Sequence, residues 1–188
     1  SDPENPLIFS PGPLGGIPQF PGTSKCMAIS LSPLTGIPGV SNFGGHFGAY
    51  LNYAGFDALT VAGIAPEPVM IVIDGFRREI SIVGVSGDDQ VFHLEKTLVD
   101  RFLREGHEKK DLAFLTTGIG AEHTSFGCIN SHYYDATKPV EGGKGLFRTK
   151  QAGRTGLGSV MSQKLVTAIV VLAAFPRGEN PYGAADWN

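Results

Sequence analysis

Glycine and proline interrupt the apolar segments of this sequence so often that long helices are disfavoured over most of its length. The chain of 188 residues has 26 glycines and 13 prolines, and they gather between short apolar runs. Proline lacks the backbone N–H that donates hydrogen bonds within a helix or a β-sheet, and glycine loses more backbone freedom on folding than other residues. The sequence therefore predicts short strands joined by tight turns, with few helices.

The apolar runs between these breakers give a specific set of expected elements. The expected strands are residues 6–10, 25–31, 57–63, 111–118, 125–131 and 166–174, with a hairpin of residues 68–74 and 78–85 around Gly75. Helical spacing of apolar residues predicts helices over residues 47–54, 91–106 and 156–164. Residues 11–24 are interpreted as an irregular loop and residues 133–150 as a long glycine-rich insertion.

This order predicts an α+β fold of mostly antiparallel β-sheets with a few helices. In each half of the chain a strand, a glycine-rich loop, a helix and a further strand follow one another, so we expect two related halves from an internal duplication, although identity between the halves is low. Residues 1–174 are expected to form one domain. Residues 175–188, "FPRGENPYGAADWN", have no periodicity and are interpreted as a linker toward further domains.

Charge and cysteine content exclude several classes of partner. The formal net charge of -3 gives no reason to expect nucleic acid. No apolar run is long enough to span a bilayer, and the first residues lack the basic start of a signal peptide. Cys26 and Cys128 are too few for a disulfide scaffold and have no metal-ligand spacing. We therefore expect no membrane contact and a cytoplasmic location.

Two glycine-rich segments, "SNFGGHFG" (41–48) and "KQAGRTGLG" (150–158), come immediately before or overlap predicted helix starts. Free N–H groups and the helix dipole favour anions at such a position, and glycine allows close backbone approach. The second segment lacks both the dinucleotide fingerprint and the G-K-[ST] of a P-loop. Each also has a structural interpretation: Asn42 could cap the helix, and the second segment could be a tight turn with a surface arginine.

Catalytic side chains are not evident. His46 lies inside the first glycine-rich segment and is kept as a possible site residue. Glu122 could be a general base, but a turn carboxylate is the simpler interpretation. Cys26 and Cys128 lie in apolar strand runs, where thiols are usually inert. From these residues alone, the chain is interpreted as an anion-binding or cofactor-binding module.

Six motifs in order give a resemblance to a known family. They are "NPLIFSPGPLGG", "SPLTG", "SNFGGHFG", "LNYAGFDALTVAG", "PEPV" and "QAGRTGLGSVMSQK". Over residues 5–173 the chain resembles the N-terminal domain of aldehyde ferredoxin oxidoreductases, which are tungsten or molybdenum enzymes with a bis-pterin cofactor. The resemblance implies that this domain forms the base on which two pterins sit, with magnesium joining their phosphates. Four pterin sulfurs would hold the metal, so no protein ligand is needed.

The resemblance also implies that the loops "GTSK", "SNFGG" and "KQAGRTG" contact the phosphates and pterins, and it assigns site residues by their places in these motifs. The implied cofactor-binding residues are Lys25, Asn42, Gly44, Gly45, Lys150, Gln151, Gly153, Arg154 and Gly156. The backbone carbonyls of Asn42 and Gln151 would be ligands of magnesium, a cation that prefers oxygen. Two positions depart from the family pattern: Lys25 stands where arginine is more common, and Thr155 stands where glycine is more common. The insertion at 133–150 resembles the branch that includes aromatic acyl-CoA reductases and broad-specificity aldehyde oxidoreductases, which leaves the substrate class open.

The implied activity belongs to a larger protein. The resemblance implies oxidation of an aldehyde substrate to a carboxylic acid, with electrons passing through a [4Fe-4S] cluster to ferredoxin. The cluster ligands would lie in C-terminal domains missing from this chain, and family members usually have a further N-terminal segment. The chain alone is expected to be inactive, and a homodimer is possible. The alternatives are a stand-alone phosphate-binding, pterin-binding or interaction module, and a redox-inactive partner subunit.

Overall fold

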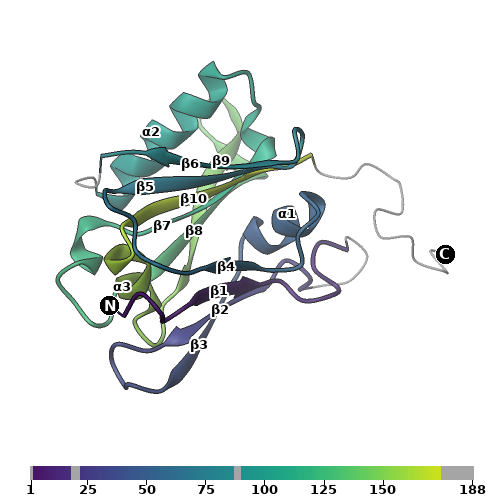
Figure 1. Ribbon diagram of the computed structural model, residues 1–188. Coiled ribbons are helices and arrows are strands. Elements are labelled where there is room, and N and C mark those ends of the chain that lie inside the picture. The colour runs from purple at the N-terminus through teal and green to yellow at the C-terminus, as the bar shows by residue number, and fades with distance from the viewer. Residues whose placement is uncertain (1, 18–21, 87–89, 175–188) are drawn as a thin grey trace.

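Two stacked β-sheets form the body of the protein (Figure 1). The computed structural model describes residues 2–17, 22–86 and 90–174, so the expected linker at 175–188 lies outside the described residues. The smaller sheet has the order β3-β2-β1-β4, and every neighbouring pair is antiparallel. Its strands are β1 (Leu7–Ser10), β2 (Cys26–Leu31), β3 (Pro38–Phe43) and β4 (Leu59–Val61).

The larger sheet has the order β6-β5-β10-β7-β8-β9. Its strands are β5 (Val69–Asp74), β6 (Glu79–Gly84), β7 (Leu112–Thr116), β8 (Ile129–Val140), β9 (Gly143–Ala152) and β10 (Val166–Leu172). Strand β10 is parallel to β5 and antiparallel to β7, and the remaining pairs are antiparallel. This confirms the predicted α+β fold with mostly antiparallel sheets.

Three α-helices of the described residues fill or cover the sheets. Helices α1 (Phe47–Tyr53) and α3 (Leu157–Gln163) lie between the sheets and share one apolar core with both of them (Figure 1). Helix α2 (Val91–Arg104) covers the outer face of the larger sheet and makes a second core there. Short 3-10 turns occupy Lys109–Asp111 and Ile119–Ala121. No helix in the described part of the chain has the length and apolar character to cross a bilayer.

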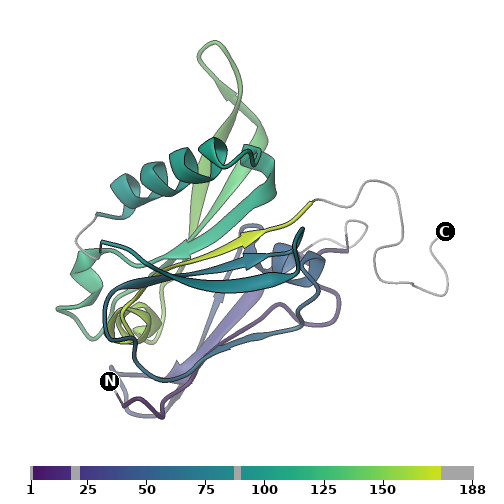
Figure 2. The same ribbon diagram turned by 45° about the horizontal axis from the view of Figure 1, so that its top comes forward.

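Three segments differ from the sequence-based expectation. Residues 38–43 form β3, a strand that the sequence analysis did not include. The expected insertion at 133–150 is not a loop, because it forms most of the long hairpin of β8 and β9, whose end projects from the body in Figure 2. The expected strand at 125–131 begins only at Ile129. The three expected helices and the hairpin around Gly75 are confirmed.

Part of each sheet has the same topology. In the smaller sheet, β1, β2, β3, α1 and β4 follow in sequence and give the order β3-β2-β1-β4. In the larger sheet, β7, β8, β9, α3 and β10 follow in sequence and give the order β9-β8-β7-β10. The strand directions also correspond, since each pair within both sets is antiparallel. Descent of the two halves from one duplicated unit stays a prediction.

Candidate cofactor-binding site

Two lysines meet at the end of strand β3. Lys25 comes directly before β2, and Lys150 lies near the end of β9. Between them is Gly44, the first residue after β3. A Cβ placed on Gly44 would lie 3.8 Å from Lys25 Nζ and 3.7 Å from Lys150 Cγ. The fold therefore brings together two cations that are 125 positions apart in sequence and leaves a backbone without a side chain between them.

The next residue, Gly45, presses against strand β8. Its φ of 95° is a conformation that residues with a side chain rarely adopt. A Cβ there would lie only 2.8 Å from Ser131 Oγ and 3.1 Å from Tyr133 Cδ1. Glycine is required at this position because both the backbone angle and the space exclude a side chain. The turn that follows leads directly into α1, with His46 in the N-cap position.

Two buried polar atoms beside Gly45 lack a hydrogen-bond partner among the described residues. They are Ser131 Oγ and His46 Nδ1. The His46 ring lies against Tyr133 and Tyr50, with ring centroids 4.7 and 5.6 Å away. Buried polar groups normally have a partner, so these atoms indicate a site whose polar contacts are incomplete in the protein alone. Burial lowers the pKa of His46, although the charge of Asp135 opposes this shift.

The second glycine-rich segment is hydrogen-bonded to β3. The backbone N–H of Arg154 donates to Ser41 Oγ at 3.1 Å, and Ser32 Oγ donates to the carbonyl of Thr155 at 2.7 Å. Thr155 has a φ of 62°. Its Cβ lies only 2.7 Å from the position that a Cβ on Gly39 would occupy, so Thr155 packs into the space that the glycine leaves. Both predicted anion-binding segments thus converge on β3, although the sequence separates them by about a hundred positions.

Asn42 and Gln151 occupy corresponding places in the two sets of strands. Each is the penultimate residue of an edge strand, β3 or β9, and pairs with Met27 or Asn130 respectively. Gln151 Nε2 donates to Asn130 Oδ1 at 3.2 Å. Because Asn42 lies inside β3 and His46 is the N-cap residue of α1, the capping interpretation of Asn42 is wrong.

The remaining predicted residues lie at the tip of the second segment. Gly153 and Arg154 are exposed after the end of β9. Gly156 is the N-cap residue of α3 with a φ of 69°, and a Cβ there would overlap the carbonyl oxygen of Ser125. Within the described chain, Lys25, Lys150 and Arg154 form no ion pair. Three exposed cations without carboxylate partners favour an anionic ligand at this surface.

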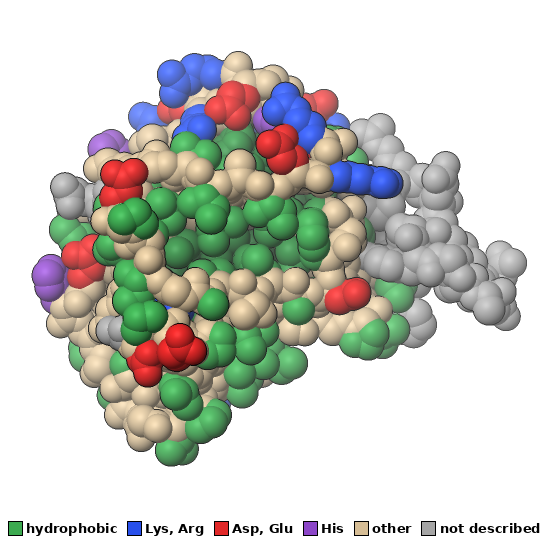
Figure 3. Space-filling model, in the orientation of Figure 1, with side chains coloured by type: hydrophobic (Ala, Val, Ile, Leu, Met, Phe, Trp, Pro, Cys, Tyr) green, Lys and Arg blue, Asp and Glu red, His purple; other side chains and the backbone are tan. Residues whose placement is uncertain are grey.

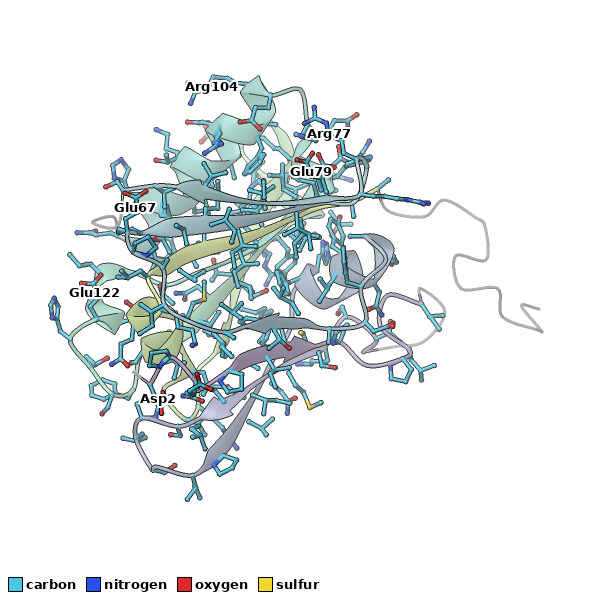
Figure 4. The ribbon with its side chains drawn as sticks, viewed as in Figure 1. Asp2, Glu67, Arg77, Glu79, Arg104 and Glu122 are labelled. Carbon is cyan, nitrogen blue, oxygen red and sulfur yellow. The ribbon has the colours of Figure 1, made fainter. Side chains whose placement is uncertain are left out.

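Other candidates from the sequence do not join this site. Cys26 is buried, and burial raises the pKa of its thiol to about 12, as expected for an inert core cysteine. Cys128 is half-buried, with Sγ 3.9 Å from Asn130 Oδ1. Glu122 follows a 3-10 turn and lies beside Pro68, at the left of Figure 4. The described residues contain no group of three His, Cys, Asp or Glu side chains that could hold a metal ion.

Sequence reasoning missed the residues that support the two segments. Ser131 lies in no motif, and Ser32 and Ser41 are the first residues of "SPLTG" and "SNFGGHFG" but received no role there, because a serine in a strand or a turn is usually unremarkable. Their roles depend on contacts across long separations, such as the 123 positions between Ser32 and Thr155. Gly39 was also missed, although glycine within a strand is a recognised sign of close approach by another segment.

Comparison with known proteins places this fold in a class of oxidoreductase domains. The family model of the aldehyde ferredoxin oxidoreductase N-terminal domain matches residues 1–173. The chain belongs to the aldehyde ferredoxin oxidoreductase family. It resembles the tungsten-containing aldehyde ferredoxin oxidoreductase of Pyrococcus horikoshii, with 35% identity over 170 residues that are 90% of this chain and 24% of that relative.

Further relatives agree with this assignment. The corresponding Pyrococcus furiosus enzyme is 34% identical over 169 residues, 90% of this chain and 25% of the relative. The chain thus spans about a quarter of the length of these enzymes. A similar solved structure, the active-site complex BamBC of benzoyl coenzyme A reductase with 1,5 dienoyl-CoA, has a TM-score of 0.66 and 23% identity. The matched region covers 92% of this chain and 23% of the solved chain, and this likeness supports the fold alone.

Proposed function

We propose that this chain is the cofactor-binding base of an enzyme that oxidises aldehydes to carboxylic acids. The observation that carries the proposal is the convergence of both glycine-rich segments on β3, with Lys25 and Lys150 both next to Gly44. Family membership supports it, because the relatives are named as tungsten-containing enzymes. The cofactor that family membership implies for this chain would be a tungsten or molybdenum bis-pterin with magnesium.

The residues present fit such a group. Gly44 leaves a cradle beside the two lysines that a side chain at this position would narrow, and Gly45 allows the turn to pack against β8. Next to it, Ser131 Oγ and His46 Nδ1 are buried polar atoms that lack partners among the described residues. A phosphorylated ligand is rich in oxygen acceptors, and the lysines next to the cradle would offset its negative charge. A cradle, unpaired cations and available donors together match a polyanionic cofactor.

Each residue would have a separate role in holding the cofactor. Lys25, Lys150 and Arg154 would bind phosphate oxygens, and arginine can do so with two parallel hydrogen bonds. Gly44 and Gly153 would allow the backbone to approach the cofactor closely, and Gly45 and Gly156 allow the two turns that carry them to pack against Ser131 and Ser125. The carbonyls of Asn42 and Gln151, at corresponding places in two edge strands, would bind magnesium.

The chain's contribution to the reaction is therefore positioning and charge compensation. When bound, the metal and pterin would supply two-electron oxidation of an aldehyde with water as the oxygen source. Further domains of the parent protein would supply the substrate pocket, a [4Fe-4S] cluster and the contact with ferredoxin. His46 would remain neutral against Tyr133 because burial lowers its pKa, so it adds no positive charge at the cradle.

Metal and pterin content of the parent protein tests this proposal. The Lys25→Ala, Lys150→Ala and Arg154→Ala triple variant should lose most of its tungsten or molybdenum together with its pterin. The matched control is Lys138→Ala with Lys144→Ala, which removes exposed lysines from the projecting hairpin. Elemental analysis gives the metal, fluorescence after oxidation gives the pterin, and the unfolding midpoint shows that the variants are folded.

Two results would contradict the proposal. If the triple variant keeps its metal and pterin, the three cations are not in the site. If the parent protein binds no metal and no pterin in a host that supplies both, a non-catalytic phosphate-binding, pterin-binding or interaction module becomes the better interpretation. Loss of both in the triple variant alone, with the hairpin control fully loaded, supports the assignment.

A further inference from the structure

A small polar pocket lies where strands β7 and β10 meet helix α3. Its volume is about 10 Å³, enough for one particle of the size of a water molecule. Three residues with hydroxyl groups line it: Thr117 follows the last residue of β7, Thr167 is the second residue of β10, and Ser162 is the penultimate residue of α3. The pocket is thus at the C-terminal end of α3, whereas Gly156 of the proposed cofactor site is at its N-terminal end.

The side chains that carry these hydroxyl groups are nearly enclosed. Thr117 is 5%, Ser162 is 7% and Thr167 is 8% exposed. No hydrogen bond joins any of the three hydroxyl groups to another residue of the described chain. Their oxygen atoms are not completely enclosed, so they open into the pocket that these residues line. Because buried polar groups normally have a partner, three such groups at one small pocket point to a bound species.

The charge around the pocket is negative. The side chain of Glu122 lines the pocket, and its carboxylate forms no ion pair or hydrogen bond within the described residues. No lysine, arginine or histidine is among the described residues that line it. Acidic side chains and no lysine or arginine are visible at the left edge of the molecule in Figure 3, level with the labels of Glu67 and Glu122 in Figure 4. The C-terminal end of α3 adds the negative end of a helix dipole.

Size and charge together select the kind of ligand. An anion is disfavoured beside Glu122, and the nearby Lys164 does not offset this charge, since its Nζ donates to the carbonyls of Gly63 and Pro3. Carboxylate and hydroxyl oxygens are ligands that hard cations prefer. One carboxylate balances one positive charge, whereas a divalent ion would leave a net charge in a mostly enclosed site. A monovalent ion close to water in size therefore fits the pocket.

We propose that this pocket binds a monovalent alkali-metal cation, potassium or sodium. Its protein ligands are the Glu122 carboxylate and the hydroxyl oxygens of Thr117, Ser162 and Thr167, and water completes its coordination on the side of the exposed Glu122. The ion joins the end of β7, the start of β10 and the end of α3. The inference depends on the lining and burial of these residues and does not depend on the proposed cofactor.

Titration of the 188-residue chain with alkali chlorides tests the proposal. At constant ionic strength, KCl or NaCl replaces choline chloride, whose cation is too large for the pocket. The backbone amide NMR signals of Thr117 and Thr167 should shift and reach saturation. Because the ion binds only the folded chain, the midpoint of urea unfolding should also rise with KCl or NaCl and level off.

Substitution of the carboxylate separates ion binding from a general salt effect. Glu122→Gln should weaken the apparent affinity for the cation by about tenfold or more, since a neutral amide does not balance its charge. In choline chloride this variant and wild type should unfold at the same urea midpoint, and KCl or NaCl should raise only the midpoint of wild type. The matched control is Glu141→Gln, an exposed carboxylate in the turn between β8 and β9, which should titrate as wild type does.

Three results would overturn the proposal. The first is the same response to choline, sodium and potassium chlorides, which would show that the pocket holds water only. The second is a saturable response to MgCl₂ or CaCl₂ without one to either alkali chloride, which would show a divalent site. The third is an unchanged alkali-ion affinity in Glu122→Gln. A saturable response to potassium or sodium in wild type and Glu141→Gln, lost in Glu122→Gln, supports the site.

Discussion

Gly44 and Gly45 are neighbours in sequence but have different structural requirements. Gly45 has a φ of 95°, and its missing Cβ would stand 2.8 Å from Ser131 Oγ, whereas the nearest atoms at Gly44 are at 3.7 Å. We expect Gly45→Ala to lower the free energy of unfolding by about 1–3 kcal/mol, and Gly44→Ala to change it little. Urea unfolding checks both values. Equal destabilisation by the two substitutions would contradict the described turn.

The same pair separates stability from cofactor binding. Gly44→Ala places a methyl group between Lys25 and Lys150 without backbone strain. We therefore expect this variant of the parent protein to be as stable as wild type and to contain less metal and pterin. A fully loaded Gly44→Ala protein would show that the cradle does not contact the cofactor.

The buried ring of His46 makes stability depend on pH. Burial lowers its pKa below the ordinary 6.5, so the unfolded chain binds a proton at a higher pH than the folded chain. Stability is thus complete above pH 6.5 and decreases as the pH falls below this value, by at most about 1.4 kcal/mol per pH unit. His46→Phe keeps the ring contacts with Tyr50 and Tyr133 and should flatten this slope. Denaturant unfolding at several pH values between 5 and 8 measures it.

At the scale of elements, a polar contact of Glu95 joins helix α2 to the larger sheet. Glu95 Oε2 lies 2.5 Å from Nδ1 of His132, a fully buried residue whose Nε2 contacts Thr116 Oγ1 at 2.8 Å. Glu95→Ala leaves the buried imidazole without this partner, so we expect a loss of about 1–3 kcal/mol in unfolding free energy. The control Lys96→Ala, at the exposed neighbouring position, should lower the free energy of unfolding by less than about 0.5 kcal/mol. Equal effects would show that the contact adds nothing.

The elements that sequence analysis predicted are those with apolar periodicity or an uninterrupted apolar run. Helix α2 and strand β10 are examples, because packing against the sheets requires those patterns. Strand β3 was missed because Pro38 and Gly39 disfavour a strand, and Gly39 is needed where Thr155 packs. The distal hairpin of β8 and β9 was missed because its exposed strands have no buried face and so no alternation.

At the scale of the whole molecule, Lys164 joins parts that are far apart in sequence. It is 1% exposed, follows α3, and its Nζ donates to the carbonyls of Gly63 at 2.9 Å and Pro3 at 3.4 Å. Lys164→Met keeps the length of the side chain but leaves both carbonyls without this donor. We expect a loss of about 1–3 kcal/mol in unfolding free energy, measured by urea unfolding. Lys138→Met, in the exposed hairpin, is the control and should have little effect.

Sequence and structure contribute differently to the candidate site. The motifs named Lys25, Gly44, Lys150 and Arg154, but periodicity and spacing could not show that these residues meet at β3. That arrangement depends on tertiary contacts between the sheets, such as the Ser41 hydroxyl that accepts from Arg154 N–H.

The place of β10 in the larger sheet has a consequence for synthesis of the chain. Residues 166–172 are the last described strand, yet β10 lies between β5 and β7 in the middle of the sheet. On the ribosome, the hairpin of β5 and β6 therefore cannot join the hairpin of β8 and β9 until almost the whole domain has emerged. Until then the apolar edges of β5 and β7 stay unpaired. Such long-range closure slows folding and exposes the nascent chain to aggregation, so a chaperone would have most effect in this interval.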